Sequence, residues 1–210
     1  MRDVLADLAL ESEAATALAL RVARSIDGSS RDEKERALAR IVTAVGKYWV
    51  CKRCPSFVNE AQECLGGAGY VEESILPRLY RQAPLNSIWE GSGNIQCLDV
   101  LRALRKEPAS AEAFFAELEA VRGGNRLLDA EIGALRKSIG GDARDLETRS
   151  RHIVERMGMA LQASCLVRSG NVAIADAFCE SRLGKAHGWA FGTLPADAPF
   201  DSLIERALSG

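Results

Sequence analysis

The sequence lacks a charge excess of one sign, a long apolar run and a histidine cluster, and each absence excludes a class of protein. Its 27 Lys+Arg and 29 Asp+Glu give a net charge of -2, whereas a nucleic-acid-binding domain usually carries a strong positive excess. No apolar run approaches the ~20 residues that a membrane span needs. With only 2 His and no Glu-x-x-His pair, a di-iron bundle is excluded. We expect a cytoplasmic protein that does not associate with membranes.

Cysteine is present but not in a pattern that implies disulfides or a metal site. The 6 Cys are scattered over 210 residues, a length at which a hydrophobic core makes disulfide bridges unnecessary. Cys51 and Cys54 have the CxxC spacing, but no second Cys or His pair follows at a distance typical of zinc sites. The sequence therefore predicts reduced thiols and no metal.

Apolar residues recur at spacings of three or four along almost the whole chain, and no segment alternates with a period of two, so we predict an all-α fold. The pattern predicts helices over 1–27, from Ser30 as N-cap up to a kink or restart at Pro55, over 74–82 and from Ser92 to 106. Residues 83–86 are predicted to be extended. Beyond Pro108 the predicted helices cover 110–122, 125–139, 145–169, 171–183 and 202–208. We expect a four-helix bundle over 1–106 and an additional helical extension over 107–210.

Three short segments distinguish this chain from a generic helical domain. They are residues 63–70 (ECLGGAGY), 79–83 (LYRQA) and 88–92 (IWEGS). A glycine loop, an arginine and an aromatic-Glu-Gly-Ser turn in this order resemble the C-terminal helical domain of the acyl-CoA dehydrogenase superfamily. Residues 84–95 (PLNSIWEGSGNI) are more similar to its AidB-like, alkylation-response branch.

The resemblance implies an oxidoreductase reaction in which FAD accepts a hydride from the β-carbon of an acyl-CoA while a carboxylate removes the α-proton. Glu90 matches that base. A thioester α-proton is weakly acidic, so its base needs a dry site and a raised pKa, and Trp89 with Ile88 would supply an apolar wall. Gly91 has no Cβ and lets the backbone turn sharply. The alternative is that Glu90 is a surface carboxylate near a helix start.

The same resemblance implies further ligand contacts. Ser92 and Asn94 match positions that touch the flavin, and Gly66 with Gly67 match a loop against the ADP part of FAD held by a neighbouring subunit. The alternative for the two glycines is a plain turn between helices. Arg81 either shapes the substrate pocket or forms a salt bridge.

The resemblance also implies domains and partners beyond these residues. The family's N-terminal helical domain and flavin-covering β-domain would precede Met1, so we expect a fragment that is inactive alone. We expect a homodimer or homotetramer through residues 1–106. The AidB-like branch implies DNA association, for which Arg144, Arg149, Arg151 and Arg156 would form a patch on one long helix; a solvated helix face is the alternative. A third possibility is a helical scaffold without an active site.

Overall fold

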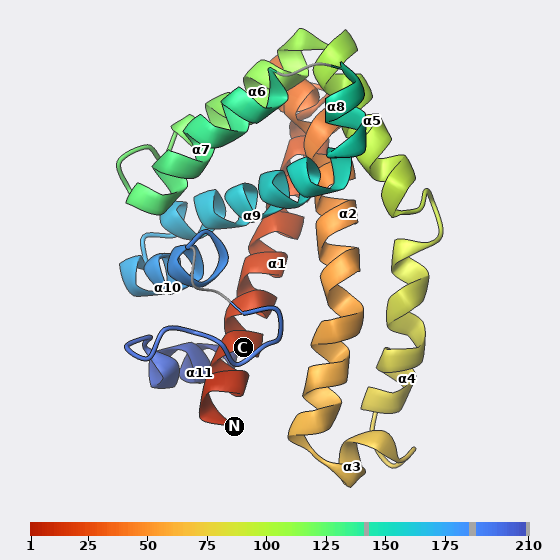
Figure 1. Ribbon diagram of the computed structural model, residues 1–210, viewed down its shortest axis with the longest axis vertical. Helices are drawn as coiled ribbons and strands as arrows, with labels where there is room; N and C mark the ends of the chain where they lie inside the picture. The colour runs from red at the N-terminus through yellow and green to blue at the C-terminus, as the bar shows by residue number, and fades with distance from the viewer. Residues whose placement is uncertain (141–142, 185–187, 209–210) are drawn as a thin grey trace.

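The computed structural model describes residues 1–140, 143–184 and 188–208, and within these ranges the protein is helical and has no strand (Figure 1). The first half contains α1 (Arg2–Gly28), α2 (Glu33–Cys64), α3 (Gly67–Tyr70), α4 (Leu76–Gln82), the 3-10 helix η1 (Ala83–Ser87) and α5 (Gly93–Lys106). The second half contains α6 (Pro108–Glu119), α7 (Arg126–Ile139), α8 (Ala143–Thr148), α9 (Ser150–Arg168), α10 (Val172–Arg182) and α11 (Phe200–Leu208). The all-α prediction is confirmed.

Helix α1 buries a narrow apolar stripe because its small and aliphatic residues recur every fourth position. Ala6, Leu10, Ala14 and Leu18 are all fully buried. This is the i, i+4 face of a helix. Leu5 lies off this stripe and is 40% exposed, so the pattern predicts the helix correctly but centres its buried face on other residues.

Helix α2 begins later and continues further than the sequence predicted. Its N-cap is Asp32, whose carboxylate accepts a hydrogen bond from the Lys34 amide at 2.8 Å, so the prediction of Ser30 as the cap is wrong. Pro55 lies inside the helix without ending it. Proline removes one main-chain hydrogen bond, and the packing of this long helix on several neighbours outweighs that loss.

Helix α9 crosses α1 and α2 and joins both halves of the chain in one core (Figure 1). At the crossing the indole Nε1 of Trp49 donates a hydrogen bond to Gln162 Oε1 at 2.7 Å. Gly158 allows the approach, since a Cβ there would lie 2.7 Å from Trp49 Cβ and Cγ. The predicted helix over 145–169 is in fact two helices that meet at Arg149, which is the N-cap of α9.

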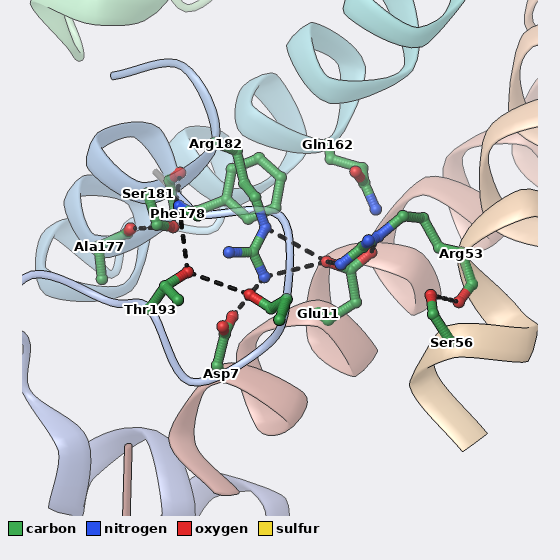
Figure 2. Close-up of polar contacts among 12 residues, drawn as sticks. Asp7, Glu11, Arg53, Ser56, Gln162, Ala177, Phe178, Ser181, Arg182 and Thr193 are labelled. Carbon is green, nitrogen blue, oxygen red and sulfur yellow. Dashed lines mark hydrogen bonds and ion pairs between the residues drawn. The ribbon is translucent and has the colours of Figure 1, made fainter. Parts of the chain in front are cut away.

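A buried group of four charges joins α10 to α1 and α2; we call Asp7, Glu11, Arg53 and Arg182 the Arg182 cluster (Figure 2). Arg182 Nη2 contacts Asp7 Oδ1 and lies 3.0 Å from Glu11 Oε2. Arg53 Nε reaches Glu11 Oε1 at 3.3 Å. Burial opposes the charged form of Arg182, but the two carboxylates raise its pKa overall.

The remaining carboxylate oxygen of Asp7 accepts a hydrogen bond from the Gly192 amide at 2.8 Å. Asp7 is fully buried, and removing one partner of a buried ion pair leaves an uncompensated charge. The cluster therefore fixes the C-terminal loop as well as α10 against the start of α1.

A second buried carboxylate, Glu117 of α6, joins three other helices. Arg21 of α1 lies 2.8 Å from Glu117 Oε1 and also 2.9 Å from Glu35 of α2, while Arg168 of α9 lies 2.8 Å from Glu117. Burial alone would raise the pKa of Glu117, but the hydrogen bonds and charges of the two arginines lower it. The carboxylate thus stays ionised and links α1, α2, α6 and α9.

The close crossing of α2 and α9 predicts that Gly158→Ala destabilises the protein although alanine is the better helix former. The added Cβ must displace Trp49, and overpacking of this kind costs about 1–3 kcal/mol in the free energy of unfolding. Gly133→Ala is the matched control, because Gly133 is exposed on α7 with nothing within 4 Å of a Cβ, and it should stabilise by up to about 1 kcal/mol. Urea unfolding of both variants checks the difference; equal stabilisation by both would contradict this packing.

Candidate functional site

The turn between η1 and α5 has the most constrained backbone in the described part of the chain. Glu90 has φ = 52° and is the only non-glycine residue there with a positive φ; Gly91 follows with φ = 98°. The prediction that residues 83–86 are extended is wrong, because Ala83–Ser87 form the 3-10 helix η1, which leads directly into this turn. A left-handed conformation is costly for a residue with a Cβ and is common at functional sites.

Two side chains from different helices hold the carbonyl groups of this turn. Lys47 of α2 donates from its ammonium group to Trp89 O at 2.5 Å and to Gly91 O. Gln96 of α5 donates from Nε2 to Glu90 O at 3.0 Å and to Gly91 O at 3.4 Å. Three consecutive carbonyls are therefore bound, and the directions of their peptide planes are fixed.

The side chains around Glu90 do not form an enclosed pocket in the described part of this chain. Glu90 is exposed, and Trp89 and Ile88 are 56% and 62% exposed. Trp89 and Ile88, which the sequence analysis predicted to form an apolar wall, directly precede Glu90 in the sequence but are open to solvent. A dry site would need another surface to cover this turn.

Ser92 and Asn94 lie in the first turn of α5, where the sequence predicted them. Ser92 is the N-cap residue in an extended conformation, yet its side chain makes no capping hydrogen bond. Both side chains are exposed. The first main-chain amides of α5 are thus left without a side-chain cap, an arrangement that suits an anionic or carbonyl oxygen of a ligand.

Gly66 and Gly67 lie away from Glu90, at the opposite end of α4 (Figure 1). Gly66 has φ = 58° and caps the four-residue helix α3, which the sequence analysis did not predict. A Cβ at either glycine would meet nothing within 4 Å. The site residues therefore form two separate groups on one chain.

Arg81 forms a salt bridge, as one of the two alternatives predicted. Its Nη1 lies 2.5 Å from Glu72 Oε1, and both side chains are more than half exposed. Arg81 is on α4 and is not bonded to Glu90. This pairing raises the pKa of Arg81 and lowers that of Glu72.

The four arginines predicted as a basic patch do not lie on one helix. Arg144 is on α8 and is exposed, whereas Arg151 and Arg156 are on α9. Arg149 pairs with Asp145, Arg156 Nε lies 2.6 Å from Glu131, and Arg151 Nε donates to the hydroxyl of Tyr48 at 3.3 Å. The predicted patch on one long helix is therefore wrong, and three of the four arginines bond to their own chain; DNA association stays a prediction.

The cysteines offer no reactive or metal-binding group among the described residues. Burial raises the pKa of Cys51 and of Cys54. No group of three or more His, Cys, Asp or Glu in the described ranges is placed to hold a metal ion. None of the described helices has the length and apolar character needed to cross a membrane.

The sequence analysis did not predict Lys47 and Gln96, whose side chains bind the carbonyl groups of the turn that contains Glu90. Lys47 is 42 residues from Trp89 in the sequence, so only the tertiary structure brings them together. Gln96 follows Glu90 by six residues, and a helix that starts at 93 places position 96 one turn later, where it can reach back to the turn. That spacing was the one available signal.

The family model for the acyl-CoA dehydrogenase C-terminal domain matches residues 1–105. The chain belongs to this family. The boundary predicted at residue 106 stays a prediction.

Two known proteins are similar in sequence to most of this chain. The putative acyl-CoA dehydrogenase AidB of Escherichia coli is 41% identical over 90% of this chain and 34% of its own length. Acyl-CoA dehydrogenase family member 11 of Caenorhabditis elegans is 31% identical over 86% of this chain and 28% of its own length. The chain thus spans about a third of the length of these relatives.

Solved structures agree with this fold. The crystal structure of Caenorhabditis elegans ACDH-11 in complex with C11-CoA superposes with a TM-score of 0.75 over 95% of this chain and 37% of its own, at 22% identity. The Bd2924 apo-form superposes with a TM-score of 0.65 over 82% of this chain and 32% of its own, at 28% identity. The first match extends beyond the family model into the second half of the chain.

The left-handed conformation of Glu90 predicts that Glu90→Gly stabilises the protein. Glycine adopts a positive φ without the steric cost that a Cβ brings. That steric cost exceeds the entropic cost of introducing glycine by about 0.5–1 kcal/mol. Glu73→Gly is the matched control, an exposed glutamate of the turn between α3 and α4 whose φ is not positive, and it should destabilise by a similar amount. Thermal unfolding of both variants checks this, and a loss of stability in Glu90→Gly equal to that in Glu73→Gly would contradict the strain.

Proposed function

We propose that this chain is the C-terminal helical part of an FAD-dependent acyl-CoA dehydrogenase-like oxidoreductase, in which Glu90 is the base. The observation that carries the proposal is the turn at Glu90, the only non-glycine left-handed residue of the described chain, held at the start of α5. Backbone strain at an otherwise regular helical unit is commonly kept where it serves chemistry. The family membership of residues 1–105 supports the same role.

In the proposed reaction Glu90 accepts the α-proton of an acyl-CoA thioester. The electron pair of the broken α-carbon bond forms the α,β double bond as a hydride leaves the β-carbon. Proton removal from so weak an acid requires a base in a water-excluded site. Because Glu90 and Trp89 are exposed here, we infer that further parts of a longer protein cover the turn.

FAD is the cofactor that the family uses, and when bound it supplies the acceptor for that hydride. The residues present fit such a ligand. Ser92 and Asn94 would hold the flavin from the uncapped first turn of α5, and the open backbone of Gly66 and Gly67 would lie against the ADP part bound by a neighbouring subunit.

The substrate pocket would include Trp89 as its apolar wall and Gly91 as the point where the backbone turns away from the acyl chain. Arg81 would contribute at the edge of the pocket only if it leaves Glu72. The crystal structure of ACDH-11, whose fold matches this chain, is a complex with C11-CoA. That ligand supports acyl-CoA as the substrate class.

We expect that Glu90→Gln, made in a longer protein that includes the upstream domains, keeps stoichiometric FAD but slows flavin reduction by acyl-CoA by roughly 10²-fold or more. The amide has the same shape as the carboxylate but cannot take the proton. Single-turnover bleaching of the flavin absorbance measures the rate, and Glu73→Gln is a matched control because that exposed carboxylate has no hydrogen-bond partner among the described residues. Unchanged bleaching in Glu90→Gln would assign Glu90 to structure alone.

We also propose that the chain forms a homodimer or homotetramer through its first half. Exposed large apolar side chains are concentrated between the end of α2 and the first half of α5, where eleven of the eighteen found among the described residues lie. They are Leu65, Tyr70, Val71, Ile75, Leu79, Tyr80, Leu85, Ile88, Trp89, Ile95 and Leu98. Apolar surface of this extent usually marks an interface, and a symmetric dimer buries the same surface twice.

Light scattering should therefore give a mass at least twice the 22.7 kDa of one chain. Leu79→Glu, on α4, should shift the protein toward the monomer, because it puts a charge into the proposed interface. Val172→Glu is the control, since Val172 is 68% exposed on α10, outside the first half of the chain. A monomer at micromolar concentration would contradict the proposal and favour a self-contained scaffold.

A further inference from the structure

The main chain of residues 89–91 accepts hydrogen bonds from two side chains that make no other hydrogen bond or ion pair in the described part of the chain. Lys47 forms no ion pair with a carboxylate there, although ion pairs are common on this chain. Its ammonium group instead donates to the two carbonyls on either side of Glu90, those of Trp89 and Gly91. An ammonium group that serves two main-chain carbonyls fixes a backbone conformation and neutralises no acid.

Gln96 completes the arrangement from the other side. Its Nε2 donates to the carbonyl of Glu90 itself at 3.0 Å and also lies 3.4 Å from Gly91 O. A Cβ at position 91 would lie 2.6 Å from Gln96 Nε2, so Gly91 leaves room for this amide in its present position. Together the two side chains bind every carbonyl from 89 to 91.

The orientation of these peptide planes decides where the Glu90 side chain points. The φ and ψ angles of Glu90 are set by the planes on its two sides, and the plane after it carries the carbonyl that Gln96 binds. The preceding plane carries the carbonyl bound by Lys47. A left-handed residue held in this way has one direction for its Cβ, whereas a free turn would relax to a negative φ and redirect the carboxylate.

We propose that Lys47 and Gln96 are positioning residues for the base Glu90. This proposal rests on the proposed function, because Lys47 and Gln96 can position a base only if Glu90 is the residue that removes the proton. Lys47 is half-buried in the middle of α2 and Gln96 is half-buried in the first turn of α5, so two helices that pack together set the position of the carboxylate. Neither residue takes the proton.

The first experiment tests the geometry on this chain alone, with a Glu-specific protease that cuts the Glu90–Gly91 bond. Cleavage requires the turn to open, and its rate follows the population of the open form. Lys47→Met keeps the side-chain stem but removes the donors, and it should speed cleavage at Glu90 by roughly tenfold or more. Lys34→Met, at a lysine of the same helix whose side chain has no hydrogen bond within the described ranges, should leave the rate unchanged.

Gln96→Leu should accelerate the same cut, and Lys47→Arg should restore most of the protection because a guanidinium keeps several donors. Cleavage at Glu90 that is as slow in Lys47→Met and Gln96→Leu as in the wild type would overturn the proposal. The cut is read by mass spectrometry, so cleavage at other glutamates reports any general unfolding.

The second experiment uses the longer, FAD-containing protein and separates positioning from structure. Lys47→Met and Gln96→Leu should each slow flavin reduction at saturating acyl-CoA by roughly tenfold or more, with unchanged FAD content and unchanged half-saturating substrate, and Lys47→Arg should recover part of the rate. If the wild type reduces its flavin and the Lys47→Met variant reduces it at the same rate, the positioning role is wrong and the proposed function stands. A wild-type protein that never reduces its flavin would overturn the proposed function and this role together.

Discussion

Three side chains of α2 connect the candidate site to the core and to the buried charges of this protein. Lys47 contacts the turn at Glu90, Trp49 contacts α9 and Arg53 contacts the Arg182 cluster. Their directions around the helix are fixed by the 3.6-residue period, so the helical register of α2 before Pro55 sets which neighbour each side chain contacts. The packing of α1, α5 and α9 on this helix therefore places the candidate site.

Under the proposed function, the candidate site is one side of a catalytic pocket. The chain contributes a carboxylate in a strained turn, the supports that hold it and the uncapped start of α5. It leaves Glu90 and Trp89 exposed, although a base for a weak carbon acid needs exclusion of water. A chain that spans about a third of the length of its relatives, with most of its exposed large apolar side chains between the end of α2 and the first half of α5, is consistent with a site that is closed by other surfaces.

The helices and the site turn could be predicted from the sequence because both depend on neighbouring residues. The periodicity around Leu18, the break at Gly28 and the start of α5 after Ser92 are local patterns, and each matches the structure. The restart at Pro55, one of the two predicted alternatives, and the single helix predicted over 145–169 were wrong, because α2 continues through Pro55 and a local turn at Arg149 separates α8 from α9. The pairing of Arg182 with Asp7 spans 175 positions, and no local pattern indicates it.

The central claim is that the Glu90 turn aims a carboxylate at the α-carbon of an acyl-CoA. A crystal structure of the longer protein with FAD and an acyl-CoA analogue that cannot be dehydrogenated tests this most directly. The account predicts a positive φ at Glu90, Lys47 and Gln96 bound to the carbonyls of residues 89–91, and a Glu90 oxygen about 3–3.5 Å from the α-carbon. A carboxylate directed away from the analogue, or a different carboxylate at that carbon, would contradict it.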